Sequence, residues 1–212
     1  VLEDPAARFS AMQSLWNGAS GANAIYARQV LTAAAAARIA PSKELEDDAP
    51  ALLTSMLAAG YDANALAWSP VVASGSQGWA LLVLAAPGRI KPVGSSAVTT
   101  FVDADGSQDK RRSAFLVAGL AALGRIDEGD ARSFSGQLGL ELDSSTRFIT
   151  ALDRAAGNGD AASVALLAGL GMQGSDWHRM TPRYLYHIVS ALRTVGLEAD
   201  ARMIAAEAVA RA

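Results

Sequence analysis

The side chains that could carry chemistry are few in this chain. It has 2 histidines and no cysteine, which excludes thiol catalysis, disulfide bonds and cysteine-ligated metals. His178 and His187 stand outside the His-Glu-x-x-His spacing and other common metal-ligand spacings. We interpret His187, between Tyr186 and Ile188, as a core or interface residue, and His178 as a residue of a surface loop. The sequence therefore predicts no metal site, no cofactor and no catalytic residue.

Segment 103–106 has two aspartates spaced as in a calcium-binding loop, but the rest of the EF-hand pattern is not present. In an EF-hand loop, glycine stands sixth and glutamate twelfth. Here glycine is fourth, at Gly106, and the twelfth residue counted from Asp103 is Ala114. The sequence also has no P-loop and no Gly-x-Ser-x-Gly motif. These observations favour a protein that is not an enzyme.

One short segment combines aromatic residues with arginine. It contains Trp177, Arg179, Arg183, Tyr184 and Tyr186. Aromatic residues and arginine are enriched at interface hot spots, because they join a large contact area to directed hydrogen bonds. Internal packing is the alternative for Tyr184, which belongs to the apolar face of its own helix. We take the five residues as candidate binding residues.

The element that positions Tyr184 is a helix that we expect to begin at Thr181-Pro182. Threonine is a good N-cap, and proline fits the first helical position, where its missing N–H costs nothing. Apolar residues follow at helical spacing, and Gly196 is the expected C-terminal stop. A second helix is predicted from about residue 198 to the end. Two helices joined by so short a turn must pack antiparallel.

The same plan recurs upstream, with an apolar run, a glycine-containing break, an Asp-Ala step and a second apolar run. The steps are Asp130-Ala131, Asp160-Ala161 and Asp200-Ala201. We expect each aspartate at or just inside the start of the second helix of its hairpin, where a carboxylate satisfies free N–H groups. This structural role explains the recurrence without chemistry.

Over about residues 110–212 the chain resembles tetratricopeptide-like and other α-solenoid helical-repeat proteins. The resemblance rests on helical hairpins whose second helix begins with Asp-Ala. It implies a curved stack of helices that holds a partner on one face, and it assigns no functional residues.

Composition supports an all-α fold. Hydrophobic residues make up 51% of the chain but aromatic residues only 6%, so much of the apolar content is alanine, the best helix former. We expect about nine to eleven helices in an irregular α-solenoid or an array of antiparallel helical hairpins. The expected parts are an irregular helical half (1–86), a non-helical connecting loop (87–108) and a helical-hairpin array (109–212), together in one continuous domain.

The charge of the chain limits its partners. With 18 Lys+Arg against 21 Asp+Glu, the net charge of −3 gives no basic field for a nucleic acid. We interpret the basic cluster Lys110-Arg111-Arg112 as a solvated first helical turn. The longest strongly apolar run, 79–86, is too short for a membrane span. A soluble protein is expected, in the cytoplasm or the periplasm.

The leading functional hypothesis is a non-catalytic scaffold or a protein- or peptide-binding module. One alternative is an enzyme or enzyme-accessory domain with a groove near the 87–108 loop or His178. Another is a structural protein that forms homo-oligomers through an alanine- and glycine-rich helix face.

Overall fold

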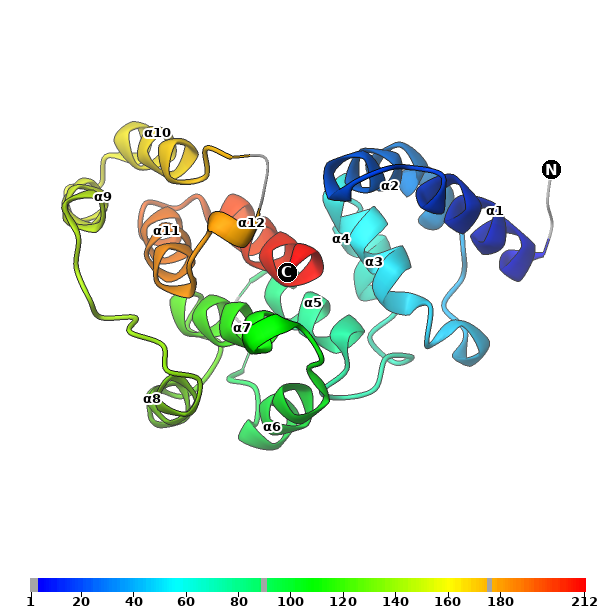
Figure 1. Ribbon diagram of the computed structural model, residues 1–212, viewed down its shortest axis with the longest axis horizontal. Helices are drawn as coiled ribbons and strands as arrows, with labels where there is room; N and C mark the ends of the chain where they lie inside the picture. The colour runs from blue at the N-terminus through cyan, green and yellow to red at the C-terminus, as the bar shows by residue number, and fades with distance from the viewer. Residues whose placement is uncertain (1–3, 89–90, 175–176) are drawn as a thin grey trace.

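The computed structural model describes residues 4–88, 91–174 and 177–212, and all regular structure in them is helical (Figure 1). This confirms the all-α class. The first helices are α1 (Pro5–Asn17), α2 (Ala22–Ala36), α3 (Ala49–Ala58), α4 (Asp62–Leu66), α5 (Gln77–Ala85) and α6 (Ser95–Ala104). The later ones are α7 (Arg111–Ala122), α8 (Glu128–Gln137), α9 (Arg147–Gly157), α10 (Ala161–Gly171), α11 (Pro182–Thr194) and α12 (Glu198–Arg211). Short 3₁₀ turns are η1 (Lys43–Leu45), η2 (Gln108–Lys110) and η3 (Trp177–Arg179).

The expected start and end of α11 are confirmed. The Thr181 side chain accepts a hydrogen bond from the backbone N–H of Tyr184, and Pro182 is the first helical residue. Gly196 follows the helix with a φ of 85°, a backbone conformation that favours glycine. Local sequence therefore sets both ends of the helix that carries Tyr184.

The recurrent aspartates also lie where the sequence predicts. Asp160 caps α10 and accepts a hydrogen bond of 3.0 Å from the backbone N–H of Ser163. Asp130 and Asp200 lie in the first turns of α8 and α12. At these positions a carboxylate meets the positive end of the helix dipole.

Helix α7 is the centre of the molecule. It packs against α5, α6, α8, α11 and α12, and every residue from 113 to 120 is buried. A helix that is apolar on all sides must be enclosed by other elements. In Figure 1, α1–α4 lie on one side of this centre and α8–α11 on the other, with α12 between the two groups.

The C-terminal helices form the expected pairs, and α12 also reaches the N-terminal half. Helices α9 and α10 pack together, as do α11 and α12, while α12 packs in addition on α3, α5 and α7. In a strict solenoid each unit contacts only its neighbours. The hairpin pairs are therefore present, and a solenoid arrangement is not confirmed.

Small residues let α7 and α12 approach closely. A Cβ atom added to Gly119 of α7 would lie 3.2 Å from the Cβ of Ala205 of α12 and 3.0 Å from Leu84 of α5. Ala205 itself is fully buried. The high alanine content thus serves close helix contact as well as helix formation.

The prediction of a non-helical segment over 87–108 is wrong for residues 95–104, which form α6. The apolar face of α6 consists of Val98, Phe101 and Val102, all buried. Its Ser, Thr and Val residues have modest helix propensity, so burial of that face stabilises the helix.

The basic cluster is not a solvated first turn. Lys110 precedes α7, and Arg111 and Arg112 begin it. Each of the three side chains donates a hydrogen bond to a backbone carbonyl elsewhere in the chain. Arg111 and Arg112 are half-buried, because these carbonyls bind them inside the fold.

Two buried arginines join the C-terminal half to the end of α5. Arg125 is 3% exposed, and its guanidinium donates to the carbonyls of Leu84 at 2.9 Å and Ala86 at 2.6 Å. Arg202 donates to the carbonyl of Ala85. Burial, together with the charge of Arg202, lowers the pKa of Arg125 to about 10. The two cations satisfy the free carbonyls at the negative end of the α5 dipole.

Candidate functional site

Helix α12 separates two pockets. One, the Tyr26 pocket, lies between α12 and helices α2 and α3 and has a volume of about 200 Å³. The other, the Trp177 pocket, lies between α12, the end of α10 and η3 and has a volume of about 410 Å³. Glu207 lines both. The pockets are therefore neighbours on opposite sides of one helix.

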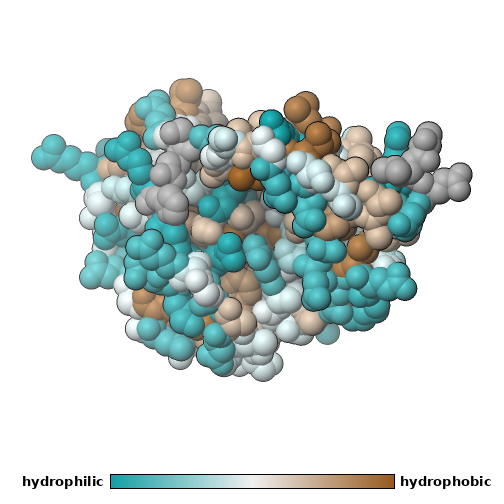
Figure 2. Space-filling view, turned by 45° about the vertical axis from the view of Figure 1, so that its right-hand side comes forward, coloured by the Kyte–Doolittle hydropathy of each residue, from teal (hydrophilic) through white to brown (hydrophobic). Residues whose placement is uncertain are grey.

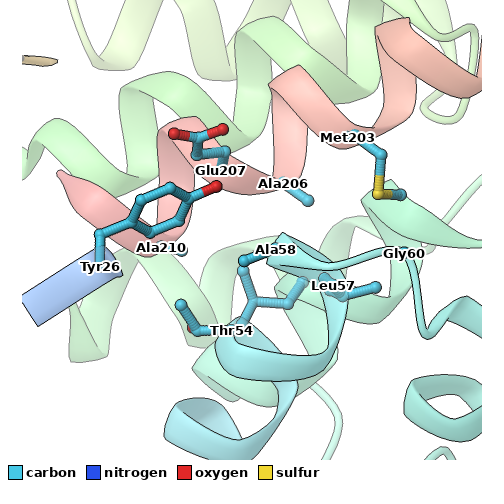
Figure 3. Close-up of a pocket in the computed structure, with 10 residues that line it drawn as sticks. Tyr26, Thr54, Leu57, Ala58, Gly60, Met203, Ala206, Glu207 and Ala210 are labelled. Carbon is cyan, nitrogen blue, oxygen red and sulfur yellow. The ribbon is translucent and has the colours of Figure 1, made fainter. Parts of the chain in front are cut away.

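The Tyr26 pocket is mainly apolar. Figure 3 shows Leu57 and Ala58 of α3 on one side and Met203 and Ala206 of α12 on the other. Polar groups come from Tyr26, Thr54 and Glu207. The Tyr26 ring closes one end of the pocket, with its hydroxyl beside the Glu207 carboxylate (Figure 3).

Glu207 is the centre of a polar network that joins three elements. Its Oε1 accepts a 2.6 Å hydrogen bond from Arg211 and a 3.4 Å hydrogen bond from the Trp177 indole. The Arg211 guanidinium lies 4.5 Å from the centre of the Tyr26 ring and also donates to Asn23 Oδ1 at 2.5 Å. The network links α2, η3 and α12, and the negative charge of Glu207 is balanced by Arg211.

Burial raises the pKa of Tyr26 to about 12, and the nearby charge of Glu207 adds to this shift, while Arg211 opposes it. Both main causes disfavour the tyrosinate, because burial removes solvent and the carboxylate repels a second negative charge. The Tyr26 hydroxyl therefore stays protonated at neutral pH and serves as a neutral polar group in the pocket.

The Trp177 pocket is wider and more polar. Its aromatic side chains rest edge-on against other rings: Trp177 on the buried Phe115, with ring centres 6.2 Å apart, and Tyr184 on the half-buried Phe148, at 5.4 Å. Apolar lining also comes from Met172, Met180 and Ile204, and charged lining from Arg179, Glu207 and Arg211. Aromatic and methionine surfaces of this kind adapt to varied apolar side chains.

Arg111 holds the turn that carries Trp177. Its Nη2 donates to the carbonyls of Trp177 at 2.5 Å and Met180 at 2.6 Å. The same guanidinium lies 4.8 Å from the centre of the Phe115 ring. A half-buried cation on α7 thus fixes one wall of the Trp177 pocket.

The five predicted binding residues do not form one site. Trp177, Arg179 and Tyr184 line the Trp177 pocket together. Arg183 instead lies 3.7 Å from the carboxylate of Glu141. Tyr186 faces a different pocket, beside Arg193 and Asp143. Tyr184 and Tyr186 diverge because side chains two positions apart on a helix point to different sides.

The pKa of Tyr186 is also raised. Burial is the main cause, and the charges of Asp143, Asp153 and Glu128 add to it. The pocket that Tyr186 faces is lined by both acidic and basic side chains. It shares no residue with the Trp177 pocket.

His187 contacts other parts of the chain, as the interpretation of it as an interface residue implies. Its Nδ1 lies 3.1 Å from Asp153 Oδ1, and its Nε2 lies 3.0 Å from the Leu142 carbonyl. It therefore connects α11 to α9 and to the segment before α9. The side chain of His178 lies outside the described residues.

The sequence analysis missed Tyr26, Glu207 and Arg211. The i,i+4 spacing of Glu207 and Arg211 is the usual signal of a helical ion pair, but it gives no sign of Tyr26, which lies far away in the sequence. Figure 2 shows hydrophilic and hydrophobic residues interspersed over one face of the molecule, and no single patch of either kind stands out on that face.

Among the described residues, no three His, Asp or Glu side chains are grouped so that they could hold a metal ion. In the same part of the chain, each helix is too short or too polar to cross a lipid bilayer.

Comparisons with protein-family models, with curated proteins and with solved structures find no match to this chain. The resemblance to tetratricopeptide-like repeats thus gains no support from relatives. The geometry and chemistry of the two pockets carry the functional argument.

Proposed function

We propose that this protein is a non-catalytic module that binds a peptide segment of a partner protein. The segment lies across α12 and places one apolar side chain in the Tyr26 pocket and another in the Trp177 pocket. The observation that carries this proposal is the pair of adjoining pockets, lined by Tyr26, Trp177, Tyr184 and Met203, on two sides of one helix. Aromatic residues dominate binding energy at interfaces, and methionine adapts to varied partners.

The size of the Tyr26 pocket favours a side chain over a whole cofactor. Sites for small molecules usually measure about 300–1,000 Å³. At about 200 Å³, the Tyr26 pocket is below this range and suits one large apolar side chain. A peptide with two anchors would use both pockets, and each anchor would strengthen the binding of the other.

The chemistry of Glu207, which lines both pockets, and of its neighbours Tyr26 and Arg211 supports a binding role over catalysis. Glu207 is neutralised by Arg211 at 2.6 Å, and the pKa of Tyr26 is raised to about 12, away from neutrality. General acid–base catalysis is most efficient when a pKa lies near the working pH. Tyr26 does not meet that condition as a base.

Selection of short random peptides on the immobilised protein tests the proposal. We expect enrichment of peptides with two large apolar residues. The binding of an enriched peptide is then measured by calorimetry with the wild type and with Ala58→Phe, which fills the Tyr26 pocket from α3. The variant should bind about tenfold more weakly, the equivalent of one lost apolar anchor.

Ala165→Phe is the matched control, because Ala165 is exposed on α10 and lines neither pocket. It should bind like the wild type. Failure to enrich any peptide, or equal binding by wild type and Ala58→Phe, would contradict the proposal.

Self-association is a second candidate function, favoured by the outer face of α10. Leu166 is 77% exposed and Leu170 is 53% exposed, and α10 contains no charged residue. Surface helices normally carry a polar outer face, and an uncharged face can meet its own copy without charge repulsion. Light scattering tests this role. We expect a dimer that Leu166→Lys dissociates, and a monomeric wild type at high concentration would overturn it.

A further inference from the structure

Among the described residues, more cations than carboxylates surround the Trp177 pocket, although the chain as a whole carries a net charge of −3. Arg179 and Arg211 line the pocket with Glu207, and Arg111 binds the turn beneath it. Arg211 is balanced by Glu207. Within the described residues, neither Arg179 nor Arg111 lies within ion-pair distance of a carboxylate, and Arg179 is exposed. This side of α12 is therefore locally positive.

The Tyr26 pocket differs in this respect. Glu207 is the one charged residue among the described residues that line it, and Arg211 binds that carboxylate and also covers the Tyr26 ring. The charges there cancel within the protein. A partner that spans both pockets would therefore meet a nearly neutral apolar pocket at one end. At the other end it would meet the Arg179 guanidinium, which no carboxylate of the described part of the chain balances.

We infer that the peptide bound across α12 carries an acidic residue next to the apolar side chain that enters the Trp177 pocket. The carboxylate lies at the rim, where Arg179 donates to it, while the apolar side chain lies between Trp177 and Tyr184. Arginine is well suited to this role, because its planar guanidinium binds carboxylates with two parallel hydrogen bonds. The inference rests on the proposed function and specifies the chemistry of its partner.

Arg111 strengthens the preference without contacting the peptide. Its cation is held by the Trp177 and Met180 carbonyls and cannot turn away. A fixed charge beside a pocket with low-dielectric walls attracts opposite charge to the pocket. The acidic preference should therefore weaken as salt increases, because the exposed contact with Arg179 is screened.

The test uses two pools of short synthetic peptides with identical apolar positions. One pool carries Asp and Glu at the remaining positions, and the other carries Lys and Arg. We expect the wild-type protein to retain the acidic pool about tenfold more strongly than the basic pool, since opposed charges select partners at an interface. Arg179→Glu should remove this preference or reverse it, and added salt should reduce it.

Arg147→Glu is the control, because it changes the net charge equally at an exposed position in the first turn of α9, where an acidic residue is favourable. This variant should keep the acidic preference. Equal retention of both pools by the wild type, or a preference unchanged in Arg179→Glu, overturns the acidic-peptide inference and leaves the peptide-binding function standing. Retention of neither pool by the wild type overturns both.

Discussion

The two sides of α12 present different surfaces from one helix. Met203 and Ala206 face the Tyr26 pocket, while Ile204 and Arg211 face the Trp177 pocket. A shift of one residue turns the helix by about 100°, so adjacent positions serve different pockets. Glu207 lies between the two directions and lines both. A single amphipathic pattern therefore cannot describe α12, which has its alanine-rich third side buried against α5 and α7.

The walls opposite α12 are also built differently. On the Tyr26 side they are two regular helices, α2 and α3, that pack against each other. On the Trp177 side a large part of the wall is a 3₁₀ turn of three residues, Trp177–Arg179, held by the Arg111 guanidinium. A turn has few hydrogen bonds of its own, so its position depends on tertiary contacts. We expect the Trp177 pocket to be the more easily disturbed of the two.

Among the variants that test this difference between the two pockets, Arg111→Met should have the largest effect on stability. The change removes two charge-assisted hydrogen bonds, to the carbonyls of Trp177 in η3 and of Met180 just after it, and keeps an apolar stem against Phe115. We expect a loss of about 3 kcal/mol in the free energy of unfolding, measured by urea denaturation. Hydrogen exchange should increase most in residues 177–184 and much less in α2 and α3.

Arg132→Met is the control for that variant, because Arg132 is exposed on α8 and forms only a surface ion pair with Glu128 at 3.6 Å. Its effect should be below about 1 kcal/mol. Increased exchange in α2 as large as that in η3 would contradict the view that Arg111 supports only the Trp177 side.

Two glycines of α10 provide a smaller and sharper test. A Cβ on Gly171, which lines the Trp177 pocket, would lie 2.6 Å from Phe148 Cζ and 3.2 Å from Ile188 Cδ1, whereas one on Gly169 would meet nothing within 4 Å. Gly171→Ala should therefore cost about 1–2 kcal/mol through overpacking. Gly169→Ala should stabilise by about 0.5–1 kcal/mol, because alanine favours the helix. Thermal unfolding of both variants measures the difference, and equal shifts would refute the close contact.

The sequence was sufficient wherever a local signal determines the structure. Thr181, Pro182 and Gly196 define α11, and Asp160 caps α10, since N-caps and C-terminal glycines act within a few residues. Helix α6 shows the opposite case. Its Pro- and Gly-rich surroundings and β-branched residues favour loop or extended structure, and only burial of Phe101 and its neighbours stabilises the helix.

In the candidate site too, residues with a local sequence signal could be predicted, and residues that depend on tertiary contacts could not. Trp177, Arg179 and Tyr184 could be predicted because they are close in sequence and of types common at interfaces. Tyr26 could not, because its partner Glu207 belongs to the last helix and their contact requires the whole fold. Buried Arg125 and Arg202 were missed for a related reason: arginine is usually exposed, and its partners here are backbone carbonyls.

The smallest predicted effect is on the ionisation of Tyr26, and it tests the contact between Tyr26 and Glu207, the residue that lines both pockets. In the wild type, Tyr26 should ionise near pH 12, measured from tyrosinate absorbance by difference from Tyr26→Phe. Glu207→Gln removes the carboxylate charge, so the pKa of Tyr26 should fall, yet stay above the ordinary value of 10.0 because burial is the larger cause. The pKa of Tyr186, which is raised by burial and by other carboxylates, should not change.

The same pKa shift has a defined consequence for stability. The folded-state pKa of Tyr26 lies above its unfolded value, so the contribution of Tyr26 is fully present below pH 10 and falls as the pH rises from 10 to about 12. The unfolded chain loses this proton first, which favours unfolding across that interval. The slope of unfolding free energy against pH should be smaller in Glu207→Gln and smallest in Tyr26→Phe. Equal slopes in the wild type and Glu207→Gln would show that the charge of Glu207 does not act on Tyr26, and an equal slope in Tyr26→Phe would contradict the raised pKa of Tyr26 itself.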